Sequence, residues 1–123
     1  MKSLLRITGL IEAITGIGLF IVPSFLVSIL LGSSLTDPVA ILTGRLAGAT
    51  LFTIAIACLF SRDDSQSYLM VKTMLGYNVF SITLLVYAGL FKGISGPGLW
   101  PAVFLHAVLL GWCVFSLSKP RLK

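Results

Sequence analysis

The sequence predicts an all-α fold: an integral membrane four-helix bundle with a short interfacial helix after the first span. Of its 123 residues, 57% are hydrophobic and 11% are charged, whereas a soluble domain carries roughly 25% charged residues. The mean hydropathy of +1.05 leaves too little polar surface to cover a water-soluble globule. Four apolar stretches each reach the ~20 residues that a helix needs to cross the bilayer.

The chain is predicted to form a single transmembrane domain over residues 1–123. Pro23 ends the first apolar stretch. Asp37 can cap the second helix, and Pro38 suits the first helical position, which needs no donor. Polar residues 61–65 and the turn-rich segment 92–98 separate the later stretches. The predicted spans are 4–22, 38–60, 68–90 and 98–117.

Residues 24–31 are apolar but too few to cross the bilayer. They are predicted to form either a short helix at the outer interface or a kinked extension of the first span. Helical periodicity alone does not separate these two arrangements.

The distribution of basic residues predicts one orientation, with both termini cytoplasmic and the protein in the cell inner membrane. With the N-terminus inside, the outer segments hold only Lys92, Arg45 lies within a span, and Trp100 is an interface anchor near the outer surface. The remaining basic residues fall on the inner side: Lys2, Arg6, Arg62, Lys72, Lys119, Arg121 and Lys123.

Each predicted span carries one polar group near the same depth. At ~1.5 Å per residue, Glu12 lies about 12 Å above the inner end of its span, Arg45 roughly 10 Å and His106 roughly 12 Å below the outer ends of theirs. Asn78, beside Tyr77, lies near the middle of the third span. Because unpaired charge is costly in hydrocarbon, Glu12 is expected to turn toward Arg45.

This polar layer has two interpretations. It is either a binding site formed by Glu12, Arg45, Tyr77, Asn78 and His106, or a purely structural register lock. Small residues at helical spacing near the charged positions indicate which helix faces point inward. They are Gly9, Ala13 and Gly16 in the first span, and Gly44 and Gly48 in the second.

Several function classes find no support in the sequence. The basic residues lie at span ends rather than on one aromatic-rich face, so no nucleic-acid partner is predicted. No metal-ligand spacing, catalytic set or cofactor motif is identifiable, and an enzyme would need a bound partner or a lipid-soluble cofactor. Cys58 and Cys113 are predicted to be buried, unpaired thiols. The expected partners are membrane lipids, and a homo-oligomer or a membrane partner subunit.

A set of short motifs resembles small uncharacterised bacterial four-helix membrane proteins similar to the DoxX-like class. These motifs are Gly9-Leu-Ile-Glu12-x3-Gly16, Pro23, Leu30-Leu31-Gly32, Arg45-x2-Gly48, Tyr77-Asn78 and Trp100-Pro101-x4-His106. The resemblance implies a four-helix bundle in the inner membrane. Some DoxX-type members are linked to quinone-coupled sulfur oxidation, so a quinone enters by resemblance only.

The glutamate in the first span and the chain length also resemble small multidrug resistance transporters, which would give Glu12 a role in proton exchange. Arg45 would neutralise that glutamate, and the charge bias forbids dual insertion. The function predicted first is therefore a binding or accessory subunit with an intramembrane pocket for a lipid-like or quinone-like ligand or a partner helix. A proton-coupled transporter and a register lock are the alternatives.

Overall fold

The computed structural model describes residues 1–61 and 63–118, and every element in this part of the chain is helical. The elements are α1 (Lys2–Ile21), α2 (Pro23–Leu31), α3 (Pro38–Phe60), α4 (Asp64–Phe91) and α5 (Leu99–Ser118). Helices α1, α3, α4 and α5 are long and apolar enough to cross a membrane. The predicted fold class is therefore confirmed: the chain is a multi-pass membrane protein with a short helix after its first span.

The helix boundaries follow local capping chemistry. The Asp37 carboxylate accepts a hydrogen bond of 2.9 Å from the amide of Ala40 at the start of α3, as the sequence predicts. Asp63 accepts one of 2.7 Å from the amide of Gln66. This second cap starts α4 at Asp64, four residues before the predicted span, so part of the polar segment 61–65 forms the first helical turn. Arg62 lies outside the described residues.

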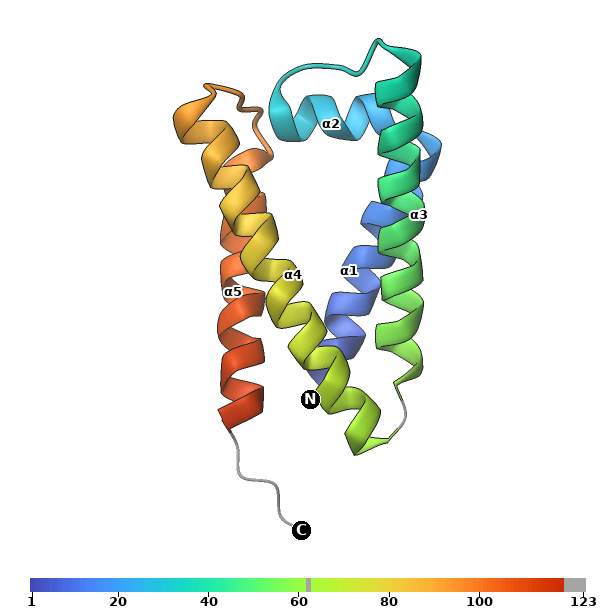
Figure 1. Ribbon diagram of the computed structural model, residues 1–123, viewed down its shortest axis with the longest axis vertical. Helices are drawn as coiled ribbons and strands as arrows, with labels where there is room; N and C mark the ends of the chain where they lie inside the picture. Colours follow the sequence, from blue (N-terminus) through green and yellow to red (C-terminus); the bar gives the residue numbers. More distant parts are fainter. Residues whose placement is uncertain (62, 119–123) are drawn as a thin grey trace.

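The four long helices form two pairs, α1 with α3 and α4 with α5 (Figure 1). The pairs approach each other where α1 begins and α5 ends, and they separate toward the opposite end. We call the first of these the terminal end and the second the α2 end. Helix α2 lies across the α2 end, nearly perpendicular to the long helices. This position agrees with the predicted interfacial helix and not with an extension of the first span.

Two glycines let α1 and α3 pack backbone against backbone. A Cβ atom added to Gly48 would lie 2.5 Å from the amide nitrogen of Phe20 and 2.6 Å from the carbonyl oxygen of Gly16. A Cβ atom on Gly16 would lie 2.7 Å from the amide nitrogen of Phe52. Any side chain at either position would force the helices apart. Gly16 and Gly48, two of the small residues predicted to point inward, thus lie in the contact between α1 and α3, whereas Gly44 faces Pro23 and Leu35.

Helix α2 connects the two pairs at the α2 end. Gly32 ends α2 in the left-handed conformation, with φ of 76°, which glycine adopts without strain. The amides of Gly96 and Gly98, in the α4–α5 loop, donate hydrogen bonds of 3.1 Å and 2.9 Å to the carbonyls of Leu30 and Ile29. Trp100 lies at this end as well, beside Gly89.

A buried apolar cluster holds the pairs together nearer the terminal end. It draws on all four long helices, and Cys58 and Cys113 are both buried in it as free thiols. The thiol of Cys58 lies 3.3 Å from the sulfur of Met74. The remaining core members are Leu4, Leu5, Val71 and Leu109.

The outer surface of the long helices is apolar. Val39, Phe80 and Phe104 are each at least 70% exposed, and comparable side chains surround every long helix. Surfaces of this kind are energetically favourable in contact with lipid and unfavourable in contact with water.

The close α1–α3 contact makes a specific prediction. Replacing Gly48 with Ala should lower the free energy of unfolding by about 1–3 kcal/mol, because the new methyl group meets backbone atoms that cannot move aside. Gly76 on α4 is the matched control, since a Cβ atom there would meet nothing within 4 Å. Thermal unfolding in detergent micelles measures both variants. Equal stability of Gly48→Ala and Gly76→Ala would contradict the packing.

Candidate intramembrane binding site

A cavity of about 640 Å³ lies between the two helix pairs. Leu30 of α2 lines it at the α2 end. Ile54 and Tyr77 line it while also packing against the core cluster, which therefore forms its floor. Most of the remaining wall is apolar: Ile11, Leu19, Ala47, Leu51, Leu84, Leu85, Ala102 and Leu105.

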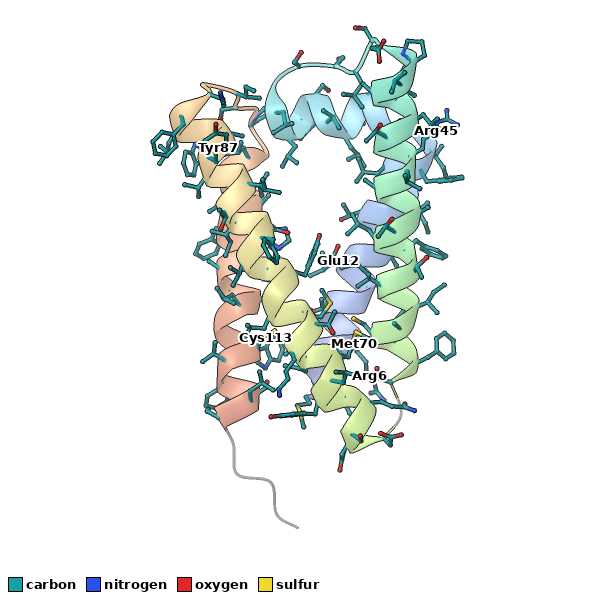
Figure 2. The ribbon with its side chains drawn as sticks, in the orientation of Figure 1. Arg6, Glu12, Arg45, Met70, Tyr87 and Cys113 are labelled. Carbon is teal, nitrogen blue, oxygen red and sulfur yellow. The ribbon has the colours of Figure 1, made fainter. Side chains whose placement is uncertain are left out.

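Glu12 reaches this cavity from α1. It lies three residues after Gly9 and four before Gly16, so helical spacing puts it on the face that packs inward. Only 2% of the residue is exposed, and its side chain points into the space between the pairs (Figure 2). The hydroxyl of Tyr77 donates a hydrogen bond of 3.3 Å to the Glu12 carboxylate.

His106 and Asn78 form a second hydrogen-bonded unit beside the first. The side-chain amide of Asn78 donates to the carbonyl oxygen of Met74 at 2.7 Å, which directs its own oxygen to Nδ1 of His106 at 2.8 Å. An amide oxygen only accepts, so Nδ1 of His106 carries the proton. In the neutral ring, Nε2 is then an acceptor.

Tyr77 links these two units. Its ring meets the His106 ring edge-on, with the centroids 5.6 Å apart, while its hydroxyl reaches Glu12. Of the sequence-predicted site residues, the structure thus brings together Glu12, Tyr77, Asn78 and His106. Asn78 is 1% exposed and acts behind His106 rather than on the cavity wall.

The expected pair between Glu12 and Arg45 does not form, and this prediction is wrong. Arg45 is exposed and lines a separate pocket of about 330 Å³ at the junction of α1 and α2, with Val22 and Pro23. Figure 2 shows Arg45 on the outer side of α3, well toward the α2 end from Glu12. The ion pair found among the described residues is Lys2 with Asp64, at 3.7 Å.

Rotation about the helix axis explains the error. Arg45 and Ile54 are nine positions apart, which is about two and a half helical turns, so they lie on opposite faces of α3. Ile54 faces the cavity, and Arg45 therefore faces away from it. The sequence gives the depth of Arg45 along α3, but depth alone does not show toward which side of the helix the side chain points.

Three hydroxyl groups on the cavity wall were not predicted as site residues: Thr15, Thr50 and Ser81. Two follow from spacing, because Thr15 comes one turn after Glu12 and Ser81 one turn after Tyr77 on the same faces. Thr50 carries no comparable signal. Its hydroxyl donates to the carbonyl of Leu46 and so offers the cavity only an acceptor.

The polar groups of the cavity can bind one end of an amphiphilic molecule. Its wall holds a carboxyl group, a phenol and an imidazole, with no Lys or Arg among the described lining residues. No group of three or more His, Cys, Asp or Glu side chains in residues 1–61 and 63–118 is placed to hold a metal ion. The chemistry available is hydrogen bonding and proton exchange at one site in an otherwise apolar space.

Comparisons with models of known protein families, with curated proteins and with solved structures find no match to this chain. The resemblance to the DoxX-like class therefore gains no support from them, and no family is assigned.

The His106–Asn78 contact predicts a defined tautomer. The chain has one histidine, so its ring ¹⁵N signals can be assigned without ambiguity. The wild-type ring should show a protonated Nδ1. Asn78→Ala removes the acceptor, so a tautomer with a protonated Nε2 should appear and the free energy of unfolding should fall by about 1–3 kcal/mol.

Thr83→Ala on the exposed side of α4 is the control for this measurement, because its hydroxyl bonds only to its own helix. It should leave both the tautomer and the stability close to those of the wild type. A ring that keeps Nδ1 protonated in Asn78→Ala would contradict the proposed role of Asn78.

Proposed function

We propose that this protein binds a lipid-soluble amphiphile within the membrane, as a binding protein or as an accessory subunit of a larger membrane assembly. The polar end of the ligand lies against Glu12, Tyr77 and His106, and its apolar part lies along the wall toward α2. The observation that carries this proposal is the cavity itself, which is apolar over most of its wall and polar at one place.

The size and composition of the cavity support a small ligand. Small-molecule sites typically enclose about 300–1,000 Å³ and combine an apolar wall with a few convergent polar groups. Buried polar groups without partners are costly in hydrocarbon. The carboxylate of Glu12 receives one hydrogen bond in the part of the chain that the structure describes, so a ligand that adds hydrogen bonds there is favoured.

The proposed ligand is lipid-like or quinone-like. Both types combine a polar head with an apolar tail, as the cavity requires. The quinone rests on the resemblance to DoxX-like proteins alone, while the lipid-like ligand rests on the cavity wall. A helix of a partner subunit is a less suitable occupant, because α2 and its hydrogen bonds to the α4–α5 loop cross the α2 end of the cavity.

The other functions predicted from the sequence use the same residues. A register lock requires the polar groups to pack tightly against one another, and the cavity between the helix pairs argues against it. A proton-coupled transporter requires Glu12 to be free of a fixed cation, and the separation of Glu12 from Arg45 favours it. Ligand binding is the step that a binding protein and a transporter share.

Filling the cavity tests the proposal. The probe is nitroxide-labelled dodecanol added to the protein in lipid nanodiscs. Its electron paramagnetic resonance spectrum shows an immobilised population when the protein binds the probe. Ala102→Leu puts bulk into the cavity wall and should reduce this population severalfold. Ala107→Leu on the same helix is the matched control, because Ala107 is exposed on the lipid side, and it should bind as the wild type does.

Two outcomes would overturn the proposal. One is an immobilised population no larger than that of ordinary lipid at the protein surface. The other is equal binding by Ala102→Leu and Ala107→Leu. Thermal unfolding of both variants establishes that they are folded when the binding is measured.

We also propose that the terminal end faces the cytoplasm in the cell inner membrane, because the basic residues concentrate at that end. A cysteine at exposed Ser65 should then react with a membrane-impermeant maleimide only in opened vesicles, and one at exposed Ser33 should react in intact cells. The buried native thiols give a low background. The reverse labelling pattern would overturn this orientation.

A further inference from the structure

Two buried hydroxyl groups below the cavity have no hydrogen-bond partner. The side-chain oxygens of Thr8 and Ser67 are fully enclosed and unpaired, and the two residues are 1% and 0% exposed. An unpaired hydroxyl in an apolar interior loses its hydrogen bonds to water and gains none in return, which is unfavourable. Their state therefore needs a physical explanation.

Other hydroxyls in the long helices avoid this cost by bonding to their own backbone. Thr and Ser side chains at exposed positions donate to the carbonyl four residues earlier, at distances from 2.7 to 3.1 Å. Thr8 and Ser67 make no such bond. The hydroxyls of Thr8 and Ser67 thus lack the backbone hydrogen bond that these six hydroxyls make. The exposed set is Thr43, Thr50, Thr53, Ser61, Thr73 and Thr83.

Thr8 and Ser67 lie on the inward faces of α1 and α4, between the cavity and the terminal end. Thr8 is one turn below Glu12 on α1, and Ser67 is one turn below Val71, a core residue of α4. The two helices run parallel, since Lys2 pairs with Asp64 at their first turns and Glu12 pairs with Tyr77 higher up.

These residues form a polar series along the axes of α1 and α4. At ~1.5 Å per residue, Ser67 lies about 4.5 Å above Asp64, Thr8 about 9 Å above Lys2, and Glu12 about 15 Å above Lys2. The series begins at the exposed Lys2–Asp64 ion pair and ends at the carboxyl group on the cavity floor. Thr8 and Ser67 therefore lie at heights between the ion pair and the carboxyl group, where ordered water can connect polar groups that do not meet directly.

We propose that Thr8 and Ser67 hold ordered water molecules that connect Glu12 to the aqueous phase at the terminal end. Water supplies the partner that each hydroxyl lacks, in the way that buried waters usually satisfy internal polar groups. A proton taken up by the Glu12 carboxylate then comes from water at the terminal end and returns by the same route. Glu12 exchanges protons from one side of the membrane, whatever ligand the cavity holds.

The surroundings of Glu12 offer few competing proton donors. The titratable groups that face it are Cys58 from α3, Tyr77 from α4 and His106 from α5. None of these groups reaches the terminal surface, because Cys58 is buried in the core cluster and the other two line the cavity. At that surface, Lys2 and Asp64 are exposed.

Hydrogen–deuterium exchange of the Glu12 carboxyl group tests this connection. Infrared difference spectra after a change to D₂O follow the carboxyl band, and Glu12→Gln identifies it by its loss. Thr8→Val and Ser67→Ala should each slow the exchange about tenfold, the factor that one lost hydrogen bond gives. Thr8→Ser keeps the hydroxyl and should exchange at the wild-type rate. Thr83→Val is the control, because it removes a hydroxyl that is exposed on α4 and far from the proposed water molecules.

Exchange in Thr8→Val and Ser67→Ala as fast as in Thr83→Val would overturn the proposal. A rise in thermal stability of Thr8→Val with unchanged exchange would likewise overturn it, because a dry, unpaired hydroxyl gains when it is replaced by a methyl group. Since the spectra are recorded without added amphiphile, failure here leaves the ligand-binding proposal standing, and failure of ligand binding leaves this one standing.

Discussion

The cavity depends on the fact that the two helix pairs are joined at their ends and separated between them. Within the α1–α3 pair, Gly16 and Gly48 allow contact at the backbone. The core cluster closes the terminal end. At the α2 end, two backbone hydrogen bonds from Gly96 and Gly98 hold α2 against the α4–α5 loop. Both carbonyls lie in the last turn of α2, where the helix itself supplies no donor.

Much of this architecture is predictable from the sequence, because hydrocarbon imposes simple rules. Span length and hydropathy locate the four long helices, and Asp37 with Pro38 fixes the start of α3 to the residue. The sequence predicts the start of α4 four residues too late, because a polar segment resembles the end of a helix. Asp63 instead caps a polar first turn that extends beyond the apolar region. The short length of the segment after Pro23 was sufficient to predict that α2 does not cross.

The candidate site was predictable where two independent signals coincide. Glu12 shares a face with Gly9 and Gly16, which must point inward to allow close packing, and this coincidence placed it correctly. Arg45 is adjacent in sequence to Gly44, but adjacency on a helix means a rotation of about 100°, and the depth estimate ignores it. Large apolar side chains are exposed along the length of α3, so its hydrophobic pattern alone does not indicate which way Arg45 points. The direction of the Arg45 side chain is therefore seen only in the structure.

The absence of Arg45 from the polar layer changes what the buried carboxyl group can do. A fixed guanidinium would hold Glu12 as one half of a permanent ion pair, which favours a structural role. In its place, Glu12 has the hydroxyl of Tyr77 at 3.3 Å, a partner that either accepts or donates. His106 is oriented by Asn78, and no Lys or Arg lines the cavity among the described residues, so no fixed cation holds the Glu12 carboxyl group in one state. A carboxyl group in such surroundings can change its protonation state as its partners change, and the proposed connection to water at the terminal end requires this property.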